Sequence, residues 1–195
     1  MENFIYFKNL LKSYQNNKNI PYAELLSTYE WHEFRGLIIE RDNRKCVRCN
    51  LEGSKKSDRL YTRKLTEEEE IAFNEKYKKH NKEFEDSPFK LKFSFPTGVI
   101  DENPVILHVH HTYYIDGYLP WTYNSDSLIT VCQKCHNEIH QSTIIPVYKN
   151  KTKAELLKLT PCEKCHGTGF IEKFYYYQEG VCFACMGNRF KEYCV

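Results

Sequence analysis

The sequence contains no long hydrophobic run. No apolar stretch approaches the roughly 18 residues that a membrane-spanning helix requires. The first residues also lack the basic start, the uninterrupted apolar segment and the small-residue cleavage site of a secretory signal. These absences predict a cytoplasmic protein without a membrane partner.

An excess of charge of one sign is also absent. The 28 Lys and Arg residues nearly balance the 26 Asp and Glu residues, which leaves a formal net charge of +2. Charge as a whole therefore predicts no polyanionic partner, and any contact with nucleic acid must come from a local basic cluster. The candidates for such a contact are Arg41, Arg44, Lys45 and Arg48.

Cysteine, by contrast, is abundant and regularly spaced. Eight of the nine cysteines fall into four pairs whose members are separated by two residues. In a reducing compartment this pattern indicates metal binding rather than disulfides. One tetrahedral zinc ion needs two such pairs, so four pairs predict two structural zinc sites. Sixteen residues separate the last two pairs, as in a four-cysteine zinc ribbon, here formed by Cys162, Cys165, Cys182 and Cys185.

The periodicity of the remaining residues predicts a mixed α+β protein. Apolar residues recur at helical spacing over residues 4–14, 21–26 and 30–42. A capping box at Thr66 and Glu69 opens a charge-dense helix, so we expect an inserted helix after the first cysteine pair.

Two later segments complete this assignment. Apolar and polar residues alternate over 89–95 and 105–110, which predicts a β-hairpin. Another capping box, at Thr152 and Glu155, predicts a short helix in the segment before the ribbon.

Four histidines lie near the second cysteine pair. His136 and His140 are four residues apart, so a helix would place them on one face, and His110 lies at the end of the preceding strand. Three imidazoles on converging elements form an incomplete coordination shell with positions left for water and substrate. The fourth, His111, could accept a proton from water, because free imidazole has a pKa of about 6.5. Adjacent strand residues point to opposite faces, so His110 and His111 can share a site only if the strand ends or twists there.

This order of residues resembles the HNH endonuclease family, in which a strand ends in a histidine pair and a CxxCHxxxH segment begins a helix. The likeness covers residues 105–140, and the first cysteine pair is similar to the upstream zinc knuckle of many members. It implies a small ββα-metal fold on a treble-clef-like zinc knuckle. The zinc ligands that it implies are Cys46, Cys49, Cys132 and Cys135.

The resemblance also implies a reaction. One divalent ion, Mg²⁺, Mn²⁺, Ni²⁺ or Zn²⁺, would be bound by His110, His136 and His140, and His111 would be the general base. The ion would hold the scissile phosphate and stabilise the leaving oxygen. The expected activity is hydrolysis of phosphodiester bonds in DNA, with double-stranded DNA as the partner.

One segment departs from the family pattern. The motif that usually reads Asp-Asn-Leu before the second knuckle is Asp126-Ser127-Leu128 here. The central Asn of that motif positions the histidine base. We therefore expect Asn124, Asp126 or Ser127 to take over this orienting role.

These predictions divide the chain into three parts. An HNH nuclease domain spans residues 1–145 and contains the N-terminal helices, the inserted helix over 66–86 and the ββα core over 89–140. A linker helix follows over 146–160. The zinc ribbon occupies 161–195.

The ribbon itself resembles part of the DnaJ cysteine-rich domain. The stretch from Cys162 to Gly169 is similar to one repeat of that domain, and a second, imperfect repeat follows at Cys182. No J-domain signature precedes them, so a co-chaperone function does not follow. A protein partner could still bind through the ribbon, and its aromatic residues, with Lys164 and Lys173, form either a small core or a stacking surface for bases.

Two alternatives to a nuclease stay open. One is a zinc-dependent nucleic-acid-binding module that has lost activity, which the missing Asn permits. The other is a DnaJ-like interaction protein whose histidines are incidental.

Overall fold

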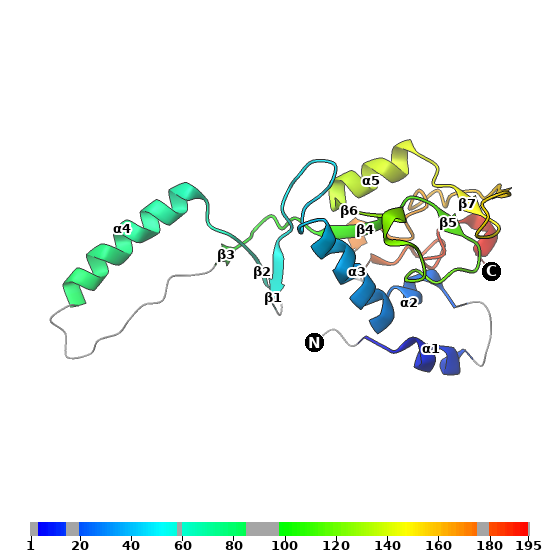
Figure 1. Cartoon of the computed structure of the whole chain (residues 1–195), viewed down its shortest axis with the longest axis horizontal. Helices are drawn as coiled ribbons and strands as arrows, with labels where there is room; N and C mark the ends of the chain where they lie inside the picture. Colours follow the sequence, from blue (N-terminus) through cyan, green and yellow to red (C-terminus); the bar gives the residue numbers. More distant parts are fainter. Residues whose placement is uncertain (1–3, 15–19, 58–59, 85–97, 175–179, 195) are drawn as a thin grey trace. The chain divides into compact units, whose positions relative to one another are not determined.

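A computed structural model describes residues 4–14, 20–57, 60–84, 98–174 and 180–194. The chain forms two compact units (Figure 1). The main unit contains residues 1–52 and 106–195, and the inserted unit contains residues 53–105. Helices and strands occur in both, as the α+β prediction requires.

The centre of the main unit is a two-stranded antiparallel sheet between two helices. Strand β4 (Leu107–His111) pairs with β6 (Leu128–Cys132), and helices α3 (Tyr29–Arg41) and α5 (Gln133–Ser142) each contact both strands (Figure 1). Leu128 and Val131 of β6 are completely buried in this arrangement. Strand β6 was not expected from the sequence, and the predicted partner strand over 89–95 lies outside the described residues.

Local signals explain why α3 forms where it does. The hydroxyl of Thr28 accepts a hydrogen bond from the Trp31 backbone N–H and caps the first turn. The buried residues of the helix then include Trp31, Ile38 and Ile39. At the end of the helix, the Asp42 carboxylate accepts a hydrogen bond of 2.8 Å from the backbone N–H of Thr130. This bond fixes α3 to the middle of β6.

A second small sheet replaces the predicted linker helix. Strand β5 (Tyr114–Ile115) pairs with β7 (Val147–Tyr148), which pairs with β8 (Leu156–Leu157). The prediction of a helix over 146–160, which rested on this capping box, is therefore wrong. Thr152 instead donates from its backbone N–H and hydroxyl to the Asn150 side chain, within the turn between β7 and β8. Burial of Val147 against the core outweighs the weak local helix signal.

The C-terminal segment is part of the main unit rather than a separate module. Its Phe190 is buried in one core cluster with Tyr114, Ile145 and Val147. The guanidinium of Arg189 lies 3.6 and 3.7 Å from the ring centroids of Tyr22 and Tyr114. The expectation of an independent domain over 161–195 is therefore wrong, because its own core is completed by residues from the rest of the chain. The remaining short elements of this unit are α1 (Phe7–Ser13), α2 (Tyr22–Leu25) and the 3₁₀ turns η1 (Ser125–Ser127), η2 (Glu172–Phe174) and η4 (Lys191–Tyr193).

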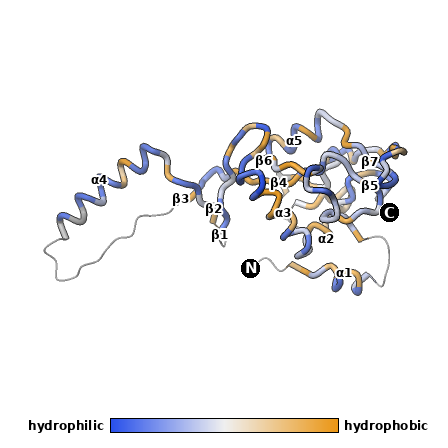
Figure 2. Tube along the Cα trace, viewed as in Figure 1, coloured by the Kyte–Doolittle hydropathy of each residue, from blue (hydrophilic) through white to orange (hydrophobic). Residues whose placement is uncertain are grey.

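The inserted unit divides the region that the sequence assigned to one domain over 1–145. It consists of the sheet β1 (Lys55–Ser57), β2 (Leu60–Arg63) and β3 (Val99–Ile100), together with α4 (Glu67–Phe84). Helix α4 confirms the predicted inserted helix, and both reciprocal bonds of its capping box are present between Thr66 and Glu69. Figure 2 shows α4 as mainly hydrophilic, with only isolated hydrophobic positions.

No helix among the described residues combines the length and the apolar character that are needed to cross a lipid bilayer.

Candidate metal centre

Three histidines come together between β4 and α5. His110 lies on the strand, and His136 and His140 lie one turn apart on the helix, with ligand atoms that are all within 4.8 Å of one another. The ring centroids of His110 and His140 are 5.0 Å apart, and those of His136 and His140 are 4.7 Å apart. This histidine triad could bind a metal ion.

The electrostatics of the triad suit a cation site. Burial lowers the pKa of His110 to about 3, with the neighbouring His140 as a second cause. Burial also lowers the pKa of His140 to about 4 and that of His136 well below its ordinary value. All three rings are therefore neutral at pH 7, the form that coordinates a metal. The Nδ1 atom of His110 is buried without a hydrogen-bond partner, so an ion would satisfy an atom that the protein leaves unpaired.

The C-terminal segment helps to orient this triad. The backbone of His166 lies beside the His140 ring and raises the pKa of His140 against the effect of burial. The adjacent Gly167 is so close that a Cβ atom at this position would lie 3.9 Å from His140 Nδ1. Backbone groups that hold the second nitrogen of a ligating imidazole commonly fix its orientation. No sequence pattern indicated this contact, since His166 and His140 belong to different predicted domains.

His111 does not join the triad. Strand β4 stays regular to its end, where His111 pairs with Leu128, so its side chain points to the face opposite that of His110. Its ring stacks on Trp31 of α3 at a centroid distance of 5.5 Å and is only 2% exposed. Burial lowers its pKa to about 3, and its Nε2 atom lies 2.9 Å from the Pro120 carbonyl oxygen. The predicted position of the base in the metal site is therefore wrong, because no twist brings His111 around to the triad.

His108 lies on the same face as His110 instead. Its ring stacks on His136 with centroids 5.1 Å apart and an interplanar angle of 1°. Its Nε2 atom is buried without a hydrogen-bond partner, and burial lowers its pKa to about 4. His108 and His110 are two positions apart in the strand, and this spacing was the sequence signal that they share a face.

The three candidate orienting residues build the turn before β6. The Asn124 side chain accepts from the Asp126 backbone N–H and caps η1. The Ser127 hydroxyl donates to the Asn124 carbonyl, and the Ser127 carbonyl accepts from the Thr112 backbone N–H. The Nε2 atom of His111 makes its hydrogen bond with the Pro120 carbonyl.

The first four-cysteine cluster joins segments more than eighty residues apart, as predicted. Its members are Cys46, Cys49, Cys132 and Cys135. The Sγ atoms of Cys49 and Cys132 are 3.6 Å apart. A tetrahedral zinc ion with Zn–S bonds of about 2.3 Å requires sulfurs about 3.8 Å apart, so the cluster could hold structural zinc. The backbone N–H of Val47 donates to the Thr130 carbonyl, which fixes this knuckle to β6.

The second cluster has the same form. It consists of Cys162, Cys165, Cys182 and Cys185, all buried. Its sulfurs are 3.9 Å apart between the first members of the pairs and 3.7 Å apart between the second members. A hydrogen bond from Cys185 lowers the pKa of the Cys165 thiol to about 5 against the effect of burial, and backbone N–H groups of Gly169 and Gly167 lower it further. These bonds favour a thiolate, the form that binds zinc.

Comparison with known proteins identifies no related protein. No family model, no curated protein and no solved structure matches this chain. The arguments about its function therefore rest on the geometry of its own residues.

The predicted basic cluster is largely engaged in structural contacts. Arg41 donates to the carbonyls of Ser125 and Leu128 and pairs with the neighbouring Asp42. Arg44, in the turn that follows α3, pairs with Glu40 of that helix, and Arg48 contacts Glu138 and the Cys135 carbonyl. Of the four predicted residues, Lys45 alone makes no side-chain hydrogen bond or ion pair with the described part of the chain. Arg41 therefore stabilises the fold, because its guanidinium is used to hold the turn before β6.

Proposed function

We propose that this protein is a metal-dependent nuclease that hydrolyses phosphodiester bonds in DNA. The observation that carries the proposal is the histidine triad: three neutral imidazoles, from one strand and one helix, converge within coordination distance of a single ion. Three protein ligands leave at least one position for water and substrate, as catalytic metal sites require. The HNH-like order of these residues in the sequence supports the same activity.

Each part of the surrounding structure has a role in this proposal. His110, His136 and His140 would hold the ion. A divalent cation there supplies stabilisation of the charge that develops on the phosphate and the leaving oxygen. The first cysteine cluster fixes the start of α5, because Cys135 immediately precedes His136. The backbone of His166 fixes the ring of His140.

A zinc-dependent nucleic-acid-binding protein without activity is the second candidate. The observation that favours it is the burial of His111, since the histidine expected to activate water is only 2% exposed and stacks on Trp31. The DnaJ-like alternative receives less support. The cysteine ribbon shares its core with the rest of the main unit and touches the triad, so the histidines are not incidental to it.

A plasmid-nicking assay tests the proposal. Purified zinc-loaded protein is incubated with supercoiled plasmid and added Mg²⁺, Mn²⁺, Ni²⁺ or Zn²⁺, beside the variants His140→Ala and His32→Ala. The parent should nick the plasmid only with an added ion. Mutation of a residue that supports a metal site typically lowers the affinity for the metal by about 10–100-fold, and loss of a ligand should lower it by at least as much. The variant His140→Ala should therefore nick slowly and recover part of its activity at higher metal concentration.

The control and the failing result are distinct. His32 is exposed and lies outside the triad, so His32→Ala should nick like the parent. If the parent binds duplex DNA but nicks it with none of the four ions, the nuclease proposal is refuted in favour of the binding module.

A further inference from the structure

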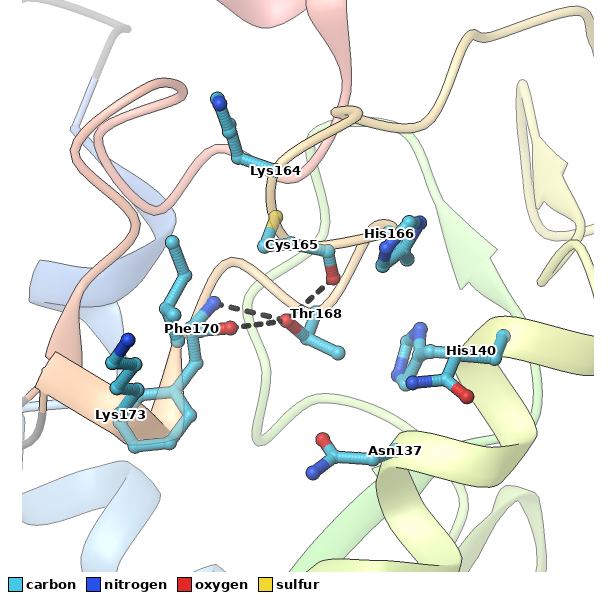
Figure 3. A pocket seen from close by; sticks show the side chains of 10 residues that line it. Asn137, His140, Lys164, Cys165, His166, Thr168, Phe170 and Lys173 are labelled. Atoms are coloured by element: carbon cyan, nitrogen blue, oxygen red, sulfur yellow. Dashed lines mark hydrogen bonds between the residues drawn. The ribbon is translucent and has the colours of Figure 1, made fainter.

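A cavity of about 480 Å³ lies between α5 and the first knuckle of the ribbon (Figure 3). Asn137 and His140 line it from the helix, and Lys164, His166 and Lys173 line it from the ribbon segment. This volume falls within the roughly 300–1,000 Å³ of typical ligand sites. We call it the ribbon cavity.

The ribbon cavity opens directly beside the histidine triad. His140 belongs to both, since its ring is a triad member and also forms part of the cavity wall. Figure 3 shows His140 and His166 facing each other across one end of the cavity. A ligand held here would therefore lie next to an ion bound by the triad.

The charge of the lining selects an anion. Lys164 and Lys173 are exposed, and no Asp or Glu is among the residues that line the cavity. Within the described part of the chain, neither amine forms an ion pair, although Glu163 interacts electrostatically with Lys164. The nearby Lys191, in contrast, pairs with Glu163. A concave site with cations on one side and no acidic group concentrates negatively charged ligands.

The same wall carries an aromatic ring. Phe170 lines the cavity, and its backbone N–H donates to the Thr168 hydroxyl (Figure 3). The single proton of that hydroxyl is shared between the carbonyls of Phe170 and Cys165, so the ring is tied to the cysteine knuckle. Lysines beside a fixed aromatic ring are the combination that binds a nucleic-acid strand, through its phosphates and one base.

We infer that the ribbon cavity binds the sugar-phosphate backbone of the substrate strand next to the scissile phosphate, with Lys164 and Lys173 as its phosphate contacts. This inference rests on the proposed nuclease function, because it takes nucleic acid to be the ligand. It assigns the ribbon to substrate binding and explains why the ribbon is built against α5.

A competing explanation is that the lysines neutralise the cysteine cluster. Four thiolates and one Zn²⁺ carry a net charge of −2, and two lysines would balance it. This explanation predicts that removal of the lysines lowers the thermal stability or the zinc content and leaves the binding of nucleic acid unchanged.

Salt-dependent binding separates the two explanations. The probe is a fluorescein-labelled 20-base-pair DNA duplex, and its anisotropy is measured with zinc-loaded protein from 50 to 300 mM KCl without other divalent ions. Each phosphate contact contributes about 0.9 to the slope of log K against log salt concentration. The variant Lys164→Ala/Lys173→Ala should therefore lose about 1.8 from that slope and bind about 10–60-fold more weakly at 0.1 M salt.

Two matched variants serve as controls. Lys149→Ala/Lys158→Ala removes two lysines from exposed positions outside the cavity, one of them paired with Glu155, and should keep the slope of the parent. Lys164→Arg/Lys173→Arg keeps the charge in the cavity and should also keep that slope.

Each outcome decides one proposal. If the double alanine variant binds with the slope of the parent, the ribbon cavity is not the phosphate site, even where the parent nicks DNA. If the slope falls by about 1.8 but the parent never nicks DNA, the cavity is confirmed and the nuclease function fails. A parent that does not bind the duplex refutes both.

Discussion

Substitution of His111 distinguishes a structural histidine from a general base. The structure places this ring between Trp31 and Tyr123, at centroid distances of 5.5 and 4.6 Å, on the face of β4 away from the triad. We therefore predict that His111→Ala acts mainly on the stability of the protein. A general base would act mainly on the rate of cleavage.

The size of the effect follows from the contacts that are lost. Removal of the bond to the buried Pro120 carbonyl should cost about 1–3 kcal/mol, since the acceptor has no access to water. The two aromatic contacts add about 0.5–1.5 kcal/mol each. A total of about 4 kcal/mol should lower the melting temperature of a chain of this size by about 8–16 °C.

The variant His111→Phe makes the assay decisive. It keeps the ring contacts with Trp31 and Tyr123 and loses only the bond to Pro120, so it should remain folded at 25 °C. Melting temperatures come from circular dichroism, and cleavage rates come from plasmid nicking at pH 7.5. A structural role predicts that folded His111→Phe cuts within about threefold of the parent, whereas loss of a general base should slow cleavage by about 10²–10⁴-fold. A folded His111→Phe variant with such a loss would refute the structural assignment.

Two further predictions concern other contacts in the main unit. Hydrogen bonds from Arg41 and Thr130 outweigh burial and lower the pKa of Asp42, so its stabilising effect is present above the ordinary pKa of about 4 and is lost as the pH falls below that value. Asp42→Asn should therefore lower the free energy of unfolding in urea by about 1.5–3 kcal/mol at pH 7, and by progressively less as the pH falls below about 4 and through the lowered pKa of the folded protein; a constant difference would contradict the argument. Cys185→Ser removes one ligand of the ribbon zinc, so it should release that zinc and disturb the backbone that orients His140. Metal affinity at the triad, measured by chelator competition, should then fall by about 10–100-fold. Unchanged affinity would show that the ribbon does not support the triad.

The sequence alone determined the features that depend on short spacings. Two residues between cysteines let one turn direct both sulfurs to one ion, so all four pairs could be found before any fold was known. Likewise, a helix places residues four apart on one face, which joined His136 to His140. The capping box at Thr66 is just as local, because both of its hydrogen bonds lie within one turn.

Only the tertiary structure decided which elements cover each face of β4. The period of a strand says that His110 and His111 point to opposite sides, but Trp31, which lies eighty positions earlier, determines that the second ring is buried in an aromatic cluster. The same reason applies to residues 146–160, where burial of Val147 against Tyr114 and pairing with β5 overcame a local helix signal. The contact between His166 and His140 likewise depends on how the ribbon packs against α5. These outcomes depend on contacts between residues far apart in the chain, and local propensity carries no information about such partners.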